Sequence, residues 1–149
     1  METYKIEESF GFLVNRLATS IRWAFEKKLE KYDLTAQQYG FLARLFEEDS
    51  QPLSSIGRNM CCDKPTITGI ANRLEKKGFI KKSRDEKDKR VVKAVLTEKG
   101  WGLKDILHKA AMGVNAETTM GISADQVNLL KKLLRISLDN LSKINEGGV

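Results

Sequence analysis

Apolar residues recur at every third or fourth position near both ends of this chain. The first series is Ile6, Phe10, Leu13, Leu17, Ile21, Phe25 and Leu29. The second series is Val127, Leu130, Leu134, Leu138, Leu141 and Ile144. This spacing places apolar side chains on one face of an α-helix. We therefore expect one long amphipathic helix at each end of the chain.

Shorter elements are predicted between these two helices. Residues 35–38, Thr-Ala-Gln-Gln, form a capping box that opens a helix running to about Phe46. The polar residues 47–52 end in proline and are expected to form a loop. A short helix with Ile56 and Met60 on one face is expected to follow.

Asp63 and Gly78 mark the two ends of the next predicted helix. Asp63 is a favourable N-cap, and Gly78 stands where helices commonly end in glycine. The expected buried face consists of Ile67, Ile70, Ala71 and Leu74. At about 100° per residue, the residues expected to point outward are Thr68, Gly69, Asn72, Arg73 and Lys76. One face of this helix is therefore free to contact a partner.

A β-hairpin and two more helices complete the order of elements. Residues 79–83 and 91–96 predict two strands joined by the wholly charged loop 84–90. Thr97 can cap a fifth helix, and a second capping box at 123–126 opens the last one. The order predicts a mainly α fold with a small β-hairpin wing, which is a winged helix-turn-helix.

Composition places the chain among globular proteins. Its 149 residues are about one domain's length, and 41% hydrophobic with 31% charged residues is not the balance of a disordered or membrane-spanning chain. No stretch approaches the roughly 18 apolar residues of a spanning helix, and residues 1–8 lack the pattern of a secretory signal. The adjacent Cys61 and Cys62 do not suit a disulfide framework. We therefore expect a cytoplasmic protein with no membrane partner.

The positive charge is concentrated in one segment. The whole chain carries a net charge of +6. Residues 58–93 hold 12 basic and 5 acidic residues, a net charge of +7, whereas the remainder holds 14 basic and 15 acidic residues, a net charge of −1. This segment covers the hairpin and the predicted helix between Asp63 and Gly78. Such a concentration is typical of a surface that binds nucleic acid or another polyanion, and a winged helix-turn-helix favours double-stranded DNA.

The helix after Asp63 carries the first candidate DNA contacts. Such a helix enters the major groove, which is about 12 Å wide. The candidate contacts are Lys64, Thr66, Thr68, Asn72 and Arg73. The first two lie at the N-terminal end, where backbone N–H groups also meet phosphates. Gly69 either permits close approach of the backbone or has no role in binding.

The hairpin tip carries the second candidate set. Its members are Arg84, Asp88, Lys89 and Arg90. An acid two residues before an arginine can hold the guanidinium by a bidentate pair and aim it outward. We interpret Asp88 as this acid and Arg90 as a side chain that enters the minor groove. The alternative is a solvated tip, because mixed charges also suit a tight loop.

Motifs in the wing and before it resemble those of a known family. Asp88-Lys89-Arg90, followed by Leu96-Thr97-Glu98-Lys99-Gly100, resembles the D-x-R…L-T-x-x-G signature of the MarR family of bacterial and archaeal transcription regulators. Residues 63–68 and 73–80 resemble that family's recognition helix and the turn into its wing. The resemblance extends from the helix start at residue 35 through the last helix.

The resemblance implies a homodimer that binds a pseudo-palindromic operator, and we expect a repressor. It implies a single MarR-type domain over residues 1–149, in which segments 1–33 and 98–146 form dimerisation helices. The winged-helix lobe then covers residues 34–97, with the helix-turn-helix at about 53–77 and the wing at about 79–97. The long apolar stripes independently favour a dimer, because an isolated domain of this size has little use for them.

The resemblance also implies release from DNA by a small aromatic or anionic effector. The residues that we nominate for its pocket are Arg16, Arg22, Trp23 and Tyr39. The alternative is that the two aromatic residues belong to the core. A different possibility is redox sensing by Cys61 and Cys62, which precede the recognition helix at its N-terminal end, a position that favours a thiolate.

Other classes of function fit less well. A winged helix can also serve as an RNA-binding or protein-interaction scaffold, but a scaffold does not need an oriented arginine at the wing tip. No enzyme is expected, because the sequence has neither a phosphate-binding glycine loop nor a nucleophile elbow. His108 is the only histidine. We therefore expect no cofactor and no metal site.

Overall fold

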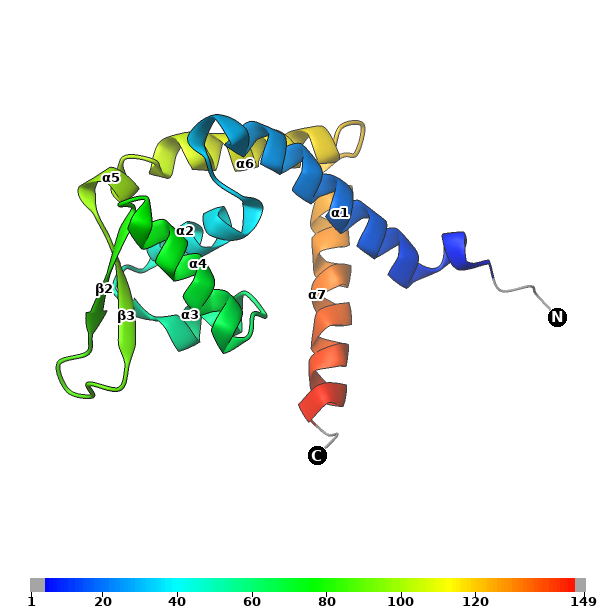
Figure 1. Cartoon of the computed structure of the whole chain (residues 1–149). Helices are drawn as coiled ribbons and strands as arrows, with labels where there is room; N and C mark the ends of the chain where they lie inside the picture. The colour runs from blue at the N-terminus through cyan, green and yellow to red at the C-terminus, as the bar shows by residue number, and fades with distance from the viewer. Residues whose placement is uncertain (1–4, 147–149) are drawn as a thin grey trace. The chain divides into compact units, whose positions relative to one another are not determined.

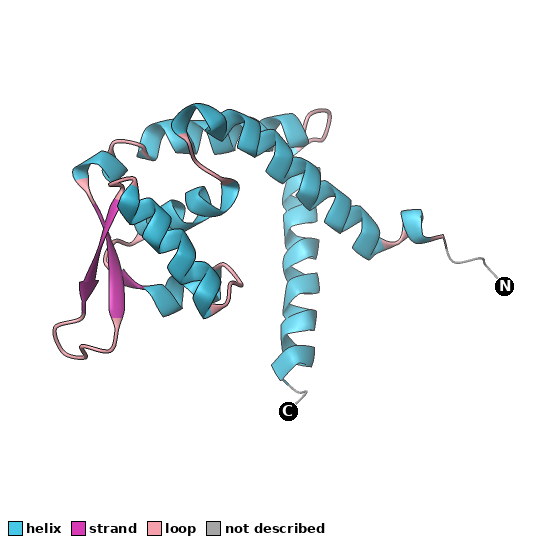
Figure 2. Ribbon diagram, in the orientation of Figure 1, coloured by secondary structure: helices cyan, strands magenta, loops and turns pink. Residues whose placement is uncertain are grey.

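The computed structural model describes residues 5–146 (Figures 1 and 2). Among them, residues 5–114 belong to one compact unit and residues 115–146 to a second. The elements of the first unit are η1 (Ile6–Glu8), α1 (Phe10–Leu29), η2 (Glu30–Tyr32), α2 (Ala36–Glu47), β1 (Gln51–Pro52), α3 (Leu53–Asn59), α4 (Lys64–Lys76), β2 (Ile80–Arg84), β3 (Val92–Leu96), α5 (Glu98–Trp101) and most of α6 (Lys104–Thr118). The second unit contains the end of α6 and α7 (Ala124–Glu146). The prediction of a mainly helical fold with a small β-hairpin is confirmed.

The sheet has three antiparallel strands in the order β1-β3-β2. β2 and β3 form the predicted hairpin, in which Ile80 lies opposite Leu96 and Arg84 lies opposite Val92. Both strands begin one residue later than predicted. Arg84 is therefore the last residue of β2 rather than the first of the loop.

β1 corrects the prediction of a loop at residues 47–52. Gln51 pairs with Ala94 and Pro52 pairs with Lys93 of β3. Proline is tolerated here because β1 is an edge strand, where an N–H group is not required on the outer side. The local pattern gave no sign of this strand, because its partner lies far along the chain.

Both predicted capping boxes form. The Thr35 hydroxyl accepts a hydrogen bond from the backbone N–H of Gln38 at 3.2 Å, and the Gln38 side chain accepts one from the N–H of Thr35 at 3.2 Å. Ser123 and Gln126 exchange the equivalent bonds at 3.3 and 3.0 Å. The starts of α2 and α7 are therefore determined by residues within one helical turn.

Two helices that the periodicity predicted as continuous are each broken. α1 begins only after Ser9, whose hydroxyl accepts a hydrogen bond from the N–H of Phe12 at 3.3 Å, so the start of the apolar stripe lies in the short helix η1. The helix predicted after Thr97 forms as α5 and α6, separated by Gly102 and Leu103. The apolar spacing continues across both breaks, so the spacing alone did not reveal them.

One hydrophobic core fills the first unit. Its fully buried large side chains are Leu29, Phe41, Leu42, Leu45, Ile56, Ile70, Leu74, Ile80 and Leu107. Leu29 of α1 and Leu107 of α6 lie in the same core as the side chains of α2 and α4. All four residues predicted on the buried face of α4 are buried. The core therefore fixes the position of α4, whose outward face carries the predicted DNA contacts.

Other apolar side chains lie outside this core. In the first unit the exposed ones include Ile6, Phe10, Leu13, Val14 and Leu17. In α7 they are Leu129, Leu130, Leu133, Ile136, Leu138, Leu141 and Ile144. Exposed apolar surface of this extent is typical of a protein–protein contact. None of the helices within residues 5–146 is long and apolar enough to cross a membrane.

Candidate nucleic-acid interface

α4 presents the predicted recognition face. Its N-cap Asp63 accepts a hydrogen bond from the backbone N–H of Thr66 at 2.8 Å, and hydrogen bonds from Thr66 hold the pKa of Asp63 below its ordinary value. At the other end Gly78 adopts φ +77°, the left-handed conformation that glycine favours. The predicted contact residues are accessible: Lys64, Asn72 and Arg73 are exposed, and Thr66 and Thr68 are half-buried.

A three-residue cluster joins α4 to β2. Glu75 accepts a hydrogen bond from the backbone N–H of Lys82 at 2.9 Å and forms a 3.1 Å ion pair with its ammonium. The same ammonium donates to Oδ1 of Asn72 at 2.6 Å. The hydrogen bonds from Lys82, the backbone one foremost, hold the pKa of Glu75 below its ordinary value. The cluster therefore ties the wing to the recognition helix.

Asp85 organises the wing tip. Its carboxylate forms a 2.6 Å ion pair with Lys93 and accepts hydrogen bonds from the backbone N–H groups of Lys87 at 2.9 Å and Asp88 at 3.0 Å. The hydrogen bond from Lys93, followed by those from the two N–H groups, lowers the pKa of Asp85 to about 2. This role of Asp85 was not predicted from the sequence, although an Asp that precedes two amides in a tight turn is a familiar signal.

The predicted pair at the wing is present. Nε and Nη2 of Arg90 donate to the two carboxylate oxygens of Asp88, each at 3.0 Å. These bonds lower the pKa of Asp88 and raise that of Arg90. The Arg90 side chain remains 92% exposed. Arg84 instead donates to the backbone carbonyl of Lys89 at 2.6 Å, so it closes the loop as well as adding charge.

The base of the wing explains the T-x-x-G part of the signature. The Thr97 hydroxyl donates to the carbonyl of Gly78 at 2.6 Å and accepts from the N–H of Gly100 at 3.1 Å. A Cβ atom on Gly100 would lie 2.1 Å from the carbonyl oxygen of Phe79. Only glycine fits this position without movement of the backbone. The two residues together fix the return of β3 into α5.

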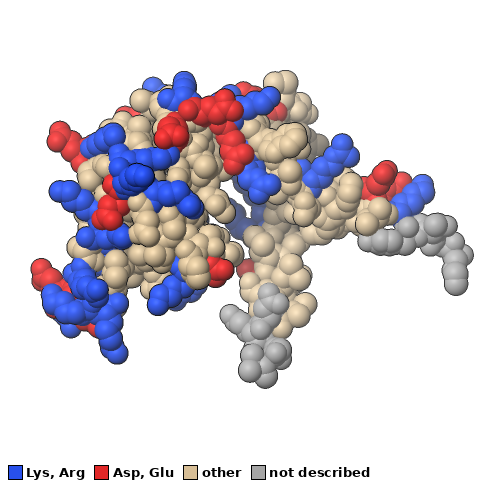
Figure 3. Space-filling model, viewed as in Figure 1, with Lys and Arg blue, Asp and Glu red and all other residues tan. Residues whose placement is uncertain are grey.

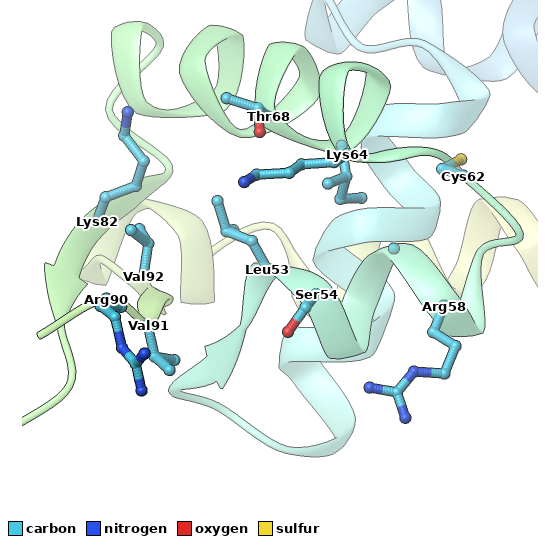
Figure 4. Close-up of a pocket in the computed structure, with 12 residues that line it drawn as sticks. Leu53, Ser54, Arg58, Cys62, Lys64, Thr68, Lys82, Arg90, Val91 and Val92 are labelled. Carbon is cyan, nitrogen blue, oxygen red and sulfur yellow. The ribbon is translucent and has the colours of Figure 1, made fainter. Parts of the chain in front are cut away.

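A cavity of about 720 Å³ lies between α3, α4 and the wing (Figure 4). Leu53, Ile67, Val91 and Val92 supply apolar lining, and its cationic lining residues are Arg58, Lys64, Lys82 and Arg90. We call it the reading-face cavity. Lysine and arginine side chains also gather over the wing tip and around α4 (Figure 3). The structure thus brings Lys64, Thr68 and Arg90 to one face. Arg58 of α3 also lies there, and it was not among the DNA contacts predicted from the sequence.

The two cysteines precede α4. Cys61 is exposed and has φ +52°, and Cys62 is half-buried, donates from its thiol to the carbonyl of Met60 at 3.4 Å and lines the reading-face cavity. Within residues 5–146, no group of three or more His, Cys, Asp and Glu side chains is arranged to hold a metal ion.

The four residues nominated for an effector pocket lie on α1 and α2. Arg16, Arg22 and Trp23 are exposed, and the Trp23 side chain is 68% exposed. Tyr39 is half-buried and packs edge-on against Phe25 with ring centroids 4.6 Å apart. Burial, followed by the charge of Glu47, raises the pKa of Tyr39. None of the four lines the reading-face cavity.

A recognition helix, a wing with an outward arginine and a basic face that joins them define a winged-helix DNA-binding protein. The model of the MarR family matches residues 34–92. The transcriptional regulator TtmR of Methylorubrum extorquens is 30% identical over 141 residues, which cover 95% of this chain and 68% of TtmR. The chain belongs to the MarR family and is a DNA-binding transcriptional regulator, not an enzyme.

Solved structures give the same result. BpsR of Bordetella bronchiseptica, whose DNA binding is regulated by 6-hydroxynicotinic acid, is 25% identical with a TM-score of 0.85, over 93% of this chain and 99% of BpsR. Reduced AbfR bound to DNA is 28% identical with a TM-score of 0.72, over 87% and 88% of the two chains. The comparisons thus include one regulator described with a small molecule and one described by its oxidation state.

Proposed function

We propose that this protein represses transcription by binding a pseudo-palindromic operator as a homodimer, and that a small aromatic or anionic effector releases it. The observation that carries the proposal is the placement of α4 and the Asp88–Arg90 pair on one basic face. A protein with this role acts where the chromosome lies, so we place it in the cytoplasm.

The proposed DNA contacts fall into two groups. Lys64, Thr66, Thr68, Asn72 and Arg73 on α4 enter the major groove. Arg84, Asp88, Lys89 and Arg90 form the wing that reaches the minor groove, with Asp88 positioning Arg90. Arg58 joins the first group because it lines the reading-face cavity beside Lys64. Phosphate contacts by the lysines fix the register, and base-edge contacts supply specificity.

The proposed dimer rests on the exposed apolar residues of α1 and α7. A monomer rarely leaves so many large apolar side chains in water, and a second copy offers the same surfaces in return. Residues 1–33 and 98–146 supply the dimerisation helices in this proposal, although the ends of α1 and α6 also contribute to the core of the lobe.

The test of the operator is selection of bound duplexes from random DNA. We expect two inverted half-sites about 10 base pairs apart, because recognition helices of a dimer enter successive major grooves. Light scattering is expected to give twice 16.8 kDa. Leu17→Asp should yield a folded monomer with weak operator binding, whereas Asn15→Asp on the same helix should remain dimeric. A monomeric wild-type protein that selects a single half-site contradicts the proposal.

The effector site is tested by titration with 6-hydroxynicotinic acid and benzoate. The exposed Trp23 supports a ligand contact on α1 rather than a role in the core of the single chain. We expect one of these acids to quench tryptophan fluorescence and to weaken operator binding, and Arg22→Gln to reduce both effects. Arg44→Gln, on α2, is the matched control. Effects of equal size in both variants would exclude Arg22 from the site.

Thiol oxidation is the second candidate for the signal. It is favoured by the position of Cys62 at the reading-face cavity and of the exposed Cys61 just before α4. Peroxide is then expected to weaken operator binding by the wild type and not by Cys61→Ser/Cys62→Ser. An equal response of the two proteins would assign both cysteines a structural role.

A further inference from the structure

A second cavity of the first unit is lined by lysines and shares no lining residue with the reading-face cavity. Its volume is about 640 Å³. The cationic lining residues are Lys27, Lys28, Lys31 and Lys109, and Glu30 is the only acid among the lining residues. Tyr32 and Ile106 supply apolar surface. We call this opening the lysine cavity.

The charge of this cavity differs from that of the other residues outside the basic segment 58–93. Outside residues 58–93 the chain has a net charge of −1. The four lysines and Glu30 together carry a net charge of +3. The other residues outside the basic segment, 10 basic and 14 acidic, therefore carry a net charge of −4. Positive charge is therefore concentrated at two places. DNA reading by α4 and the wing accounts for the first place and not for the second.

Three elements bring the lysines together. Lys27, Lys28 and Lys31 come from the end of α1 and from η2, whereas Lys109 comes from α6. Lys28 reaches α6, because a Cβ atom on Gly113 would lie 3.8 Å from its Nζ atom. The Lys31 ammonium lies 5.0 Å from the centre of the Tyr32 ring. Ammonium groups gathered around one opening repel one another, and a bound anion relieves that repulsion.

We propose that the lysine cavity binds a small anion with several phosphate groups, of the nucleoside triphosphate class. The ammonium group is a compact point charge that suits phosphate, and the lysines that line the cavity outnumber its one acid, Glu30. The volume lies within the range of about 300–1,000 Å³ that small-molecule sites occupy. Tyr32 and Ile106 provide the surface on which an uncharged part of the ligand packs.

The test is calorimetric titration of the full-length protein, without DNA, with inorganic triphosphate, ATP and AMP. We expect triphosphate and ATP to bind, and Lys31→Gln/Lys109→Gln to weaken both by about tenfold or more, the effect of losing charge-assisted hydrogen bonds. Lys131→Gln/Lys132→Gln on α7 removes the same charge away from the cavity and should bind as the wild type does. A rise in melting temperature with triphosphate, absent from the cavity variant, is the second expected readout.

Three results would overturn the proposal. The first is equal weakening in the cavity variant and the α7 control, since that would be an effect of net charge. The second is binding that Arg58→Gln/Lys64→Gln abolishes and the cavity variant does not, which would place the anion on the reading face. The third is AMP binding as tight as that of ATP. Because no DNA is present, none of these results depends on operator binding.

Discussion

Both carboxylate oxygens of Asp88 accept hydrogen bonds from the Arg90 guanidinium at 3.0 Å, while the arginine side chain stays 92% exposed. The backbone N–H of Arg90 also donates to Asp88 at 3.0 Å. An exposed arginine ordinarily samples many rotamers, and ordering it on binding has an entropic cost. The carboxylate restricts that freedom in the free protein. Asp88 therefore acts as a positioning residue for a cation that points to solvent.

Arg90→Ala is expected to weaken duplex DNA binding and to reduce the slope of affinity against salt concentration by about one unit on a log–log scale. Asp88→Asn keeps the arginine charge but loses the bidentate pair, so we expect weaker binding with the slope retained. The double variant should match Arg90→Ala. Fluorescence anisotropy over a salt series measures all three.

Glu86→Gln is the matched control for Asp88→Asn. It removes the same charge from the same wing tip, and loss of an acid beside DNA strengthens binding by reducing repulsion. If Asp88→Asn also strengthens binding, Asp88 has no positioning role.

Asp85→Asn is expected to destabilise the protein in a pH-dependent way. The folded pKa of Asp85 is about 2 against an ordinary value of 3.8. A depressed pKa contributes stability that is fully present above the ordinary value and is lost as the pH falls through the folded value. Urea unfolding should therefore show the largest difference between the two proteins above about pH 4, and a smaller one toward pH 2. A stability difference that does not change with pH would show that the charge of the Asp85 carboxylate is not its cause.

Gly100→Ala is expected to lower the free energy of unfolding by about 2 kcal/mol or more, because the new methyl group overlaps a backbone carbonyl in a buried site. Gly102→Ala is the control, since its Cβ would lie 3.5 Å or more from its neighbours. Denaturant unfolding at one fixed protein concentration measures both. Equal stability of the two variants would contradict the account of the T-x-x-G motif.

Gly69→Ala is expected to stabilise α4 by up to about 1 kcal/mol, because its Cβ would meet only the end of the Arg73 side chain at 3.7 Å. We expect duplex affinity to fall, since a methyl group then stands on the outward face. Gly113→Ala on α6 should give a similar gain in stability with unchanged DNA binding. A Gly69→Ala protein with unchanged affinity would show that this glycine has no role in binding.

Local signals predicted the elements of this fold well. The capping boxes at Thr35 and Ser123, the N-cap at Asp63 and the stop at Gly78 all involve residues within about one turn of each other. The Asp88–Arg90 pair is equally local, because its two members are two residues apart. Contacts between residues this close in sequence depend on the local backbone geometry and not on the packing of distant segments.

The candidate site was only partly predictable. Its residue types and spacing indicated α4 and the wing, but nothing local indicated that Arg58 would join Lys64 at the reading-face cavity. The role of Glu75 and Lys82 in tying the wing to α4 was also missed. These groups meet only when α3, α4 and the hairpin pack on one core.

The sequence by itself was sufficient for the order of helices, the hairpin, the basic segment and the family, because periodicity, caps and charge are properties of neighbouring residues. Only packing decided that Gln51 adds a third strand beside Ala94. Packing also places the Phe79 carbonyl so close to Gly100 that no side chain fits at that position. Packing also divided the first apolar stripe, burying Phe25 and Leu29 while Leu13 and Leu17 stayed exposed. A helical pattern shows which face is apolar, but only the long-range contacts of the folded chain determine what covers it.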